Sequence, residues 1–262
     1  MSENLQLIGL GTERVEIRLN RPHLKNSLSR ELIVLFRKAL ASVADDGRAR
    51  LLFITGEGDD FCAGVDLNWM KEISQLEAAE IAVDSRQMQQ MLSEIHTLPM
   101  PVIAIVQGRA FAGGLGIASA CDIIVAQRDA KFAITEARLG LVPAVIAPFV
   151  TQKISVSAFR EMALSGLVAN AEKMHQIGLV NYLADNQQQC IEICDQIQYS
   201  ILRSSPDALA ACKQMIRELT GQSLNQGMQS SLDWVVKTRG SSWALEGINA
   251  FLEKRKPMWN LV

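Results

Sequence analysis

The stretch MPVIAIVQGRAFAGGLGIASACDIIVAQ, residues 100–127, decides the fold. Pro101 introduces VIAIV, an unbroken apolar run that predicts a buried strand, and the glycine pair Gly113–Gly114 follows it. GIASA, residues 116–120, then predicts a short helix of small residues, and DIIVAQ predicts another strand. Unbroken apolar strands that alternate with helices are typical of a parallel sheet buried on both faces. The stretch therefore predicts an α/β fold.

The sequence before this stretch continues the same pattern. Residues 5–20 hold two apolar runs on either side of Gly11 and predict a hairpin. Ser29 precedes apolar residues at helical spacing, so we expect it to cap a helix. ARLLFIT, residues 49–55, predicts another strand buried on both faces.

The pattern becomes helical toward the C-terminus. Residues 76–96 predict a long amphipathic helix, and the chain from about residue 150 is helical, ending in a helix from about residue 232 to 256. We find no repeat, no linker and no low-complexity tract. The predicted organisation is an α/β core, residues 1–195, followed by a C-terminal helical region, residues 196–262.

Composition and charge exclude several classes of protein. Hydrophobic residues make up 48% of the chain, charged residues 21%, and the net charge of -2 gives no surface for nucleic acid or an anionic membrane. No apolar run approaches the roughly 20 residues of a membrane helix, and the N-terminus does not resemble a secretory signal. The five cysteines and three histidines lack the spacing of metal ligands. We expect a cytoplasmic protein without a metal site.

Small residues and glycine occur again in DFCAGVDLNWM, residues 60–70. Ala63 and Gly113 each follow a predicted strand and precede a predicted helix, where the first N–H groups are left unpaired. Two such N–H groups aimed at one oxygen form an oxyanion hole. Glycine placement alone leaves an alternative, in which the glycines only form tight turns that pack helices on the sheet. We expect Asp66 to be a helix cap rather than a catalyst.

Glu136 is the candidate acid or base. In FAITEARLGLVPAVIAPF, residues 132–149, it and Arg138 are the only charged residues. A carboxyl group in apolar surroundings has a raised pKa, which suits proton transfer near neutral pH. A solvated glutamate on a loop is the alternative interpretation.

The sequence resembles the crotonase (enoyl-CoA hydratase/isomerase) superfamily over nearly its whole length. The resemblance is carried by five segments: RLNRPHLKNSLS, FCAGVDL, GRAFAGGLGIASACDI, FAITEARLGLVP and FLEKRKP. It implies a ClpP-like spiral of ββα units with a C-terminal helical region that builds a homotrimer, often a dimer of trimers. It also implies an acyl-CoA thioester substrate, of which coenzyme A is a part, and no metal or redox cofactor.

The resemblance also implies roles for individual residues. The amides of Ala63 and Gly113 would hold the thioester oxygen, with Glu136 as acid and base. Lys254 matches a lysine that meets a CoA phosphate, commonly from a neighbouring subunit, although an ordinary basic helix end is an equal alternative. The other residues implied to bind substrate or CoA are His23, Leu24, Lys25, Gly64, Val65, Asp66, Leu67, Gly114 and Gly116.

Gly116 departs from the family pattern, because two-acid hydratases have a glutamate at this position. The segments AGVDLNWMK and LGLVPAVIAPFV resemble those of bacterial hydratases of methylglutaconyl-CoA and isohexenylglutaconyl-CoA. We therefore expect a hydratase of a branched or γ-carboxylated enoyl-CoA. Our hypothesis is that Gly116 leaves room for the carboxylate of the substrate, or avoids repelling it.

Three other activities stay open. An isomerase could move a double bond from the 3 to the 2 position with Glu136 alone, since this reaction needs no water. A non-catalytic acyl-CoA-binding protein and a thioester hydrolase are minor alternatives, because a fold does not fix a function.

Overall fold

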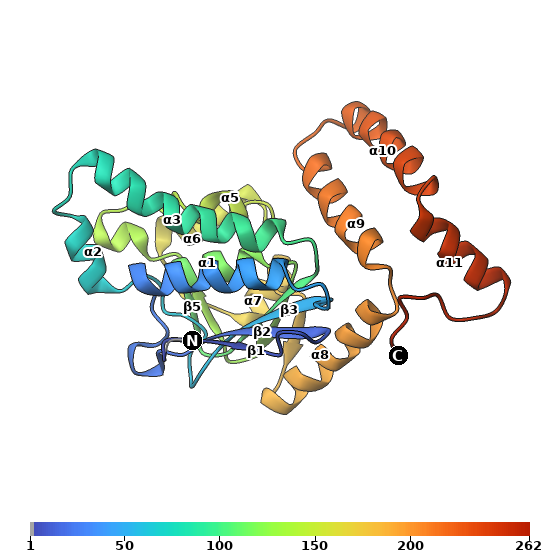
Figure 1. Cartoon of the computed structure of the whole chain (residues 1–262). Helices are drawn as coiled ribbons and strands as arrows, with labels where there is room; N and C mark the ends of the chain where they lie inside the picture. The colour runs from blue at the N-terminus through green and yellow to red at the C-terminus, as the bar shows by residue number, and fades with distance from the viewer. Residues whose placement is uncertain (1–2) are drawn as a thin grey trace.

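The computed structural model describes residues 3–262, and a six-stranded sheet lies at its centre (Figure 1). β1 and β2 are antiparallel and every other pair is parallel, which confirms the α/β class and the N-terminal hairpin. In spatial order the strands are β1 (Leu5–Ile8), β2 (Arg14–Leu19), β3 (Leu51–Gly56), β4 (Val102–Val106), β6 (Ile123–Gln127) and β9 (Tyr182–Ala184).

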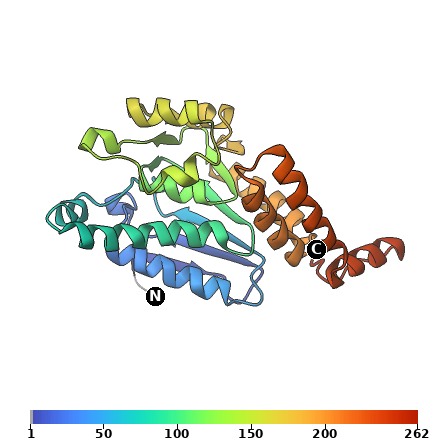
Figure 2. The same cartoon turned by 90° about the horizontal axis from the view of Figure 1, so that it is seen from above.

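Both faces of this sheet are buried, as the apolar run at residues 49–55 predicted. Side chains alternate along a strand. Leu52 and Ile54 of β3 therefore join the core beneath α1 (Arg30–Ala44) and α3 (Ala78–Thr97), while Leu51 and Phe53 pack with α8 (Gln187–Leu202). α1 and α3 lie side by side on their face of the sheet (Figures 1 and 2).

A second, three-stranded sheet contains β5 (Arg109–Phe111), β7 (Lys131–Ala133) and β8 (Ala169–Asn170). β5 and β7 are parallel, and α4 (Gly113–Ala120) begins two residues after β5 ends. The sequence pattern predicted the strands β4 and β6 on either side but not β5, because three residues are too few to show a periodicity. This small sheet positions the two glycine-containing segments, the one around Gly64 and the one around Gly113.

Helices and short helical turns make up the rest of the core. Ser29 caps α1 as predicted, since its Oγ accepts a hydrogen bond from the Leu32 N–H at 3.2 Å. α3 matches the long helix predicted over residues 76–96. The remaining elements of the core are η1 (Pro22–Leu24), α2 (Leu67–Ile73), η2 (Glu136–Leu139), α5 (Ala147–Val150), α6 (Val156–Ser165) and α7 (Ala171–Gln176).

The C-terminal helices are α9 (Pro206–Leu219), α10 (Leu224–Arg239) and α11 (Ser242–Leu252). The single helix predicted from about residue 232 to 256 is wrong, because the chain breaks between α10 and α11. Ser241 starts a new helix there, its Oγ accepting from the Ala244 N–H at 3.2 Å. The predicted division after residue 195 falls inside α8, and whether the two regions are separate domains stays a prediction.

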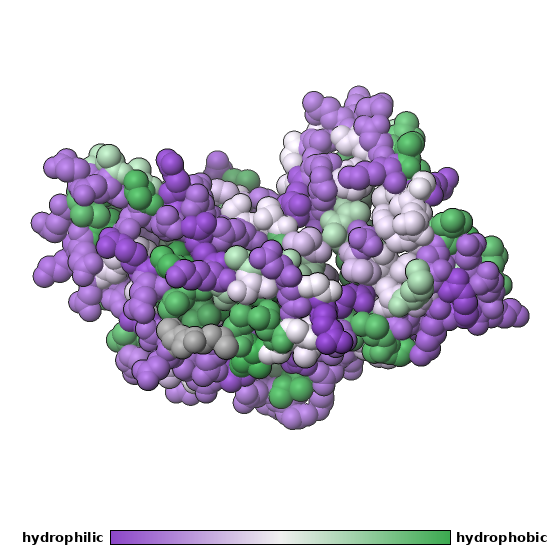
Figure 3. Space-filling view, viewed as in Figure 1, coloured by the Kyte–Doolittle hydropathy of each residue, from purple (hydrophilic) through white to green (hydrophobic). Residues whose placement is uncertain are grey.

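These helices extend away from the two sheets, and hydrophobic side chains lie on their outer surface (Figures 1 and 3). The large exposed hydrophobic residues of α10 and α11, called the C-terminal apolar face below, are Leu224, Met228, Leu232, Val235, Val236, Leu245, Ile248, Phe251 and Leu252. Within residues 3–262, none of the helices combines the length and the apolar character that crossing a membrane requires.

Candidate active site

Three chain segments lie side by side where β5 and β7 end. Cys62 forms a parallel bridge with Ala110 of β5, and Ala110 is in register with Phe132 of β7. The carboxyl ends of parallel segments meet at one edge of a sheet. The residues that follow Cys62, Ala110 and Phe132 therefore lie together at this edge. They include Val65 from the first segment and Gly113 from the second.

The two glycine segments touch at this edge. Gly64, with φ of 104°, lies so close to the second segment that a Cβ on it would stand 3.1 Å from the Phe111 oxygen and 3.8 Å from the Gly113 nitrogen. A Cβ on Gly114 would stand 2.2 Å from the Cys62 oxygen. Only glycine permits such an approach of two backbones. The prediction that the two segments meet is confirmed.

Ala112 has a strained backbone that orients the amide of Gly113. Its φ is 45° and its ψ is -113°, a combination that costs a residue with a Cβ about 1–3 kcal/mol. Its N–H donates to the Ala133 oxygen at 2.9 Å, and its own oxygen accepts from the Gly116 N–H at 3.0 Å, so both neighbours hold it in place. Across residues 3–262, the Gly113 N–H at the start of α4 has no hydrogen-bond partner.

The predicted role of the Ala63 amide is wrong. Its N–H donates to the Lys25 oxygen at 2.9 Å and is not free to bind a substrate oxygen. The Val65 N–H, in contrast, finds no hydrogen-bond partner anywhere in the described part of the chain.

Pairing with Leu28 explains which amide is free. Leu28 donates its N–H to the Gly64 oxygen at 2.7 Å and accepts from the Asp66 N–H at 2.8 Å. Because successive N–H groups of an extended segment point to opposite sides, the Val65 N–H points away from Leu28. β5 lies on that other side, and Val65 Cγ2 would be 3.7 Å from a Cβ on Gly113. Periodicity and spacing do not reveal this pairing, since Leu28 lies in a loop far away along the chain.

The loop that holds Leu28 carries the predicted CoA-contacting residues. His23, Leu24 and Lys25 lie in or directly after η1, and all three are exposed. Lys25 and Asn26 both adopt the left-handed conformation, with φ of 54° and 55°. This turn presents the exposed side chains to solvent beside the Ala63 segment.

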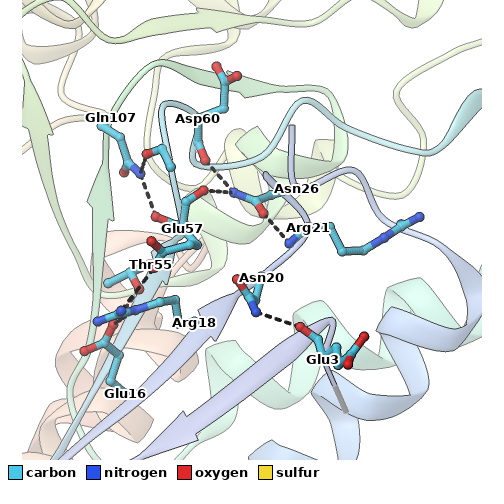
Figure 4. Close-up of polar contacts among 12 residues, drawn as sticks. Glu3, Glu16, Arg18, Asn20, Arg21, Asn26, Thr55, Glu57, Asp60 and Gln107 are labelled. Carbon is cyan, nitrogen blue, oxygen red and sulfur yellow. Dashed lines mark hydrogen bonds and ion pairs between the residues drawn. The ribbon is translucent and has the colours of Figure 1, made fainter. Parts of the chain in front are cut away.

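Asn26 fixes this loop, a role that sequence reasoning missed. It is fully buried, and its Nδ2 donates to the Glu57 oxygen at 2.9 Å and to the Asp60 oxygen at 2.6 Å. Its Oδ1 accepts from the Arg21 N–H at 2.8 Å (Figure 4). An asparagine between polar residues in KNS gives no signal of burial, because loop asparagines are mostly exposed.

Asp66 is a helix cap, as predicted. Its Oδ1 accepts from the Asn68 N–H at 3.0 Å, and its Oδ2 forms an ion pair with Arg21 at 3.2 Å. Arg21 also donates to the Ser27 oxygen at 2.7 Å, so the loop and α2 are tied together. Leu67, the first residue of α2, is 67% exposed.

A buried acid also holds α2. Asp84 of α3 accepts from Arg30 at 2.9 Å with each oxygen and from the Trp69 indole N–H at 3.0 Å. The Arg30 guanidinium lowers the pKa of the Asp84 carboxyl below its usual range, and the Trp69 N–H adds to this against the effect of burial. Trp69 is therefore a core residue.

Glu136 begins η2, three residues after the end of β7. It is half-buried, and its Oε2 is buried without a hydrogen-bond partner among residues 3–262. Burial raises the pKa of the Glu136 carboxyl above its usual range, while the backbone N–H groups of Glu136 and Thr135 act in the opposite direction. The predicted direction of the shift is confirmed, and the group is not a freely solvated surface glutamate.

Gly116 does not open a space beside this carboxyl. A Cβ on it would lie 2.5 Å from Ile146 Cγ2, 3.2 Å from Ile146 Cβ and 3.4 Å from Leu92 Cδ1. The expectation that this glycine leaves room for a carboxylate is therefore wrong, because Ile146 already fills the place.

Lys254 follows α11 and is exposed, with φ of 55°. Figures 1 and 2 both show the end of α11 well apart from α2 and the start of α3. The chain does not bring Lys254 to its own site, and contact with a neighbouring copy stays a prediction. Among the described residues, no group of three or more His, Cys, Asp and Glu side chains could hold a metal ion.

Comparison with known proteins gives consistent matches over the whole chain. The sequence model of the family described as enoyl-CoA hydratase/isomerase matches residues 13–261. A carnitinyl-CoA dehydratase of Salmonella enteritidis is 34% identical over 265 residues, which cover 99% of each protein. A crotonyl-CoA hydratase of Syntrophomonas wolfei is 31% identical over 251 residues, 91% of each. The crystal structure of an enoyl-CoA hydratase from Shewanella pealeana superposes with a TM-score of 0.92 at 28% identity, covering 98% of this chain and 96% of that one.

Proposed function

The chain belongs to the enoyl-CoA hydratase/isomerase family, and from this membership we propose that it adds water across the 2,3 double bond of an enoyl-CoA thioester. It has the crotonase fold and is an enzyme of the hydratase family. One observation supports the reaction most strongly. The Val65 and Gly113 N–H groups, which have no partner within residues 3–262, emerge at the same sheet edge as the half-buried Glu136.

In the proposed mechanism these two amides bind the thioester oxygen. When a nucleophile attacks C3 of the enoyl group, electrons move to this oxygen and an enolate forms. Each N–H donor aimed at such an oxygen contributes about 3 kcal/mol to the transition state. Val65 takes the role that the family resemblance had led us to expect of Ala63.

Glu136 is proposed to move the proton. Its carboxylate takes a proton from water as the water oxygen bonds to C3, and it then returns the proton to C2 when the enolate collapses. A pKa raised by burial suits both steps, because the group must gain and lose the proton near neutral pH.

Coenzyme A is proposed to lie along the loop that holds His23, Leu24 and Lys25 and along residues 63–67. We further propose a homotrimer or dimer of trimers in the cytoplasm, in which the C-terminal apolar face is covered by other copies. Lys254 of a neighbouring copy would then reach a CoA phosphate. The exposure of these nine large hydrophobic residues on two neighbouring helices supports the assembly, since apolar patches on a surface mark interaction sites.

For the acyl group, an apolar branched chain is better supported than a γ-carboxylated one. The atoms nearest to the Cβ position of Gly116 all belong to aliphatic side chains, those of Ile146 and Leu92. A carboxylate that loses water there would need a cation as partner.

A second candidate, the 3-enoyl-CoA to 2-enoyl-CoA isomerase, is favoured by one observation. Gly116 carries no side chain and Ile146 fills its neighbourhood, so Glu136 is the one carboxyl that we assign to the reaction. A single base that takes a proton from C2 and returns it to C4 would suffice.

Product masses separate these possibilities. The enzyme would be incubated with straight, branched and carboxylated 2-enoyl-CoAs and with a 3-enoyl-CoA, with the Glu136→Gln variant as control. Hydration adds one water, isomerisation keeps the mass and changes the retention time, hydrolysis frees coenzyme A, and a binding protein changes nothing. A water adduct formed by the wild type alone supports the proposal, and its absence with every 2-enoyl-CoA refutes it.

A further inference from the structure

The contact between Gly116 and Ile146 lies on the side of α4 where the Cβ position of Gly113 is 3.7 Å from Val65 Cγ2. Gly116 is three residues after Gly113, so both project from the same side of the helix. Met88 of α3 lies against Gly113, and Leu92, one turn further along α3, lies against Gly116. Ile146 thus completes an apolar wall that runs along α4 from the proposed oxyanion-binding amide.

Ile146 is held firmly in this wall. It is 2% exposed, and its oxygen accepts from the N–H groups of Phe149 and Val150 at 3.0 and 3.1 Å. Its branched Cβ leaves few rotamers. The side chain therefore cannot move aside cheaply for a larger residue at position 116.

Glu136 and Ile146 lie on the same chain segment, which runs from η2 to α5. The segment from η2 to α5 begins where the Leu141 N–H donates to the Glu136 oxygen at 3.1 Å, and it returns to α4 at Ile146. The segment therefore connects the proposed acid and base directly to the side chain that covers Gly116.

We infer that Ile146 is the residue that determines acyl-chain specificity in this enzyme, an inference that rests on the proposed function. It occupies the space that any side chain at position 116 would need, and it offers the acyl group an aliphatic surface in place of a second carboxylate. The substrates selected are acyl-CoAs with an uncharged acyl chain. A carboxylated chain loses hydration against Ile146, Leu92 and Met88 without gaining a hydrogen bond.

Binding of two saturated thioesters tests this inference without any turnover. Pentanoyl-CoA and glutaryl-CoA have acyl chains of the same length, and only the second ends in a carboxylate. We expect the wild type to bind glutaryl-CoA at least about tenfold more weakly, by titration calorimetry, since one desolvated charge is worth more than this. In Ile146→Ala, where water can enter, the ratio of the two Kd values should fall several-fold.

Ile154→Ala is the matched control, because Ile154 is also buried, at 5% exposure, and makes no contact with the Cβ position of Gly116. Its Kd ratio should equal that of the wild type. An unchanged ratio in Ile146→Ala, or equal Kd values in the wild type, overturns the inference. Failure of the wild type to bind either thioester overturns the proposed function and the specificity role together.

Thermal melting tests the contact independently of any substrate. Gly116→Ala should lower the melting temperature of the wild type and should lower that of Ile146→Ala much less, because the added methyl group then has space. Equal shifts in the two backgrounds would mean that Ile146 does not occupy the place of a side chain at position 116, and this overturns the inference even if acyl-CoA binds.

Discussion

The sheet edge that holds the proposed site and the C-terminal helices differ in what covers them. Cys62, Ala110 and Phe132, which align the three site segments, are all 0% exposed, whereas Met228 is 63% and Phe251 is 84% exposed on the C-terminal apolar face. The first region fixes its geometry within one chain, through glycine contacts and a strained Ala112. The second lacks a covering surface. We propose that one chain supplies the reaction chemistry, and that the C-terminal helices supply assembly.

The largest effect should come from the proposed acid and base. Glu136→Gln keeps the shape of the side chain but cannot transfer the proton, so kcat should fall about 10³-fold. The Kd for a saturated acyl-CoA and the mass of the assembly should stay within about twofold of the wild type, because neither the amides nor the C-terminal helices change. Turnover near that of the wild type would remove Glu136 from the mechanism.

Removal of the Val65 N–H should have the next largest effect. Val65→Pro deletes this donor, and kcat should fall about 10²-fold. Val65→Ala keeps the N–H and is the matched control, and a melting curve would establish that both variants fold. Equal kcat values for the two variants would show that the Val65 amide does not bind the reacting oxygen.

A change on the C-terminal apolar face should affect assembly first. Phe251→Asp places a charge on a surface that we propose is buried between copies, so sedimentation should show a shift from trimer to monomer. The loss of Lys254 from a neighbouring copy should raise KM about tenfold, about the worth of one charge-assisted hydrogen bond, and leave kcat nearly unchanged. Phe251→Leu is the control that keeps the apolar contact. A sedimentation mass that does not respond to Phe251→Asp would contradict this separation of roles.

The smallest effect concerns pH and stability. Burial raises the pKa of Glu136 above its usual 4.5, so the folded chain binds this proton more tightly than the unfolded chain. Stability therefore falls as pH rises from about 4.5 through the folded pKa, and Glu136→Gln should lack this decline. Urea midpoints measured against pH for both proteins would test this.

The rate of hydration should change in the opposite direction to stability. The carboxylate is the base, so kcat/KM should rise with pH through the same folded pKa. A rate that titrates at 4.5 or below would mean that Glu136 is solvated in the free enzyme.

Much of the architecture could be predicted because it follows from local patterns. The unbroken apolar runs of β3, β4 and β6 and the helical spacing of α1 and α3 gave the parallel sheet and its covering helices. The break between α10 and α11 was missed, because a helical pattern continues across Gly240 and only the cap at Ser241 interrupts it. The three-residue strand β5 was too short to recognise.

The site was predictable to the level of segments, but not to the level of single amides. Ala63 and Val65 lie on either side of Gly64, and nothing in the sequence distinguishes their N–H groups. The bridge between Val65 and Leu28 decides which N–H is free. In the same way, Gly116 suggests open space until Ile146, from a distant part of the chain, is seen to fill it. Both errors come from contacts between residues that are far apart in sequence, which periodicity and spacing do not report.

The infrared frequency of a bound thioester carbonyl tests the central claim most directly. Saturated pentanoyl-CoA labelled with ¹³C at this carbonyl would be bound to the wild type, Val65→Ala and Val65→Pro. Two N–H donors polarise the carbonyl, so we predict a lower stretching frequency than in free pentanoyl-CoA for the first two proteins and a smaller shift for Val65→Pro. The same bound frequency in all three proteins would contradict the account.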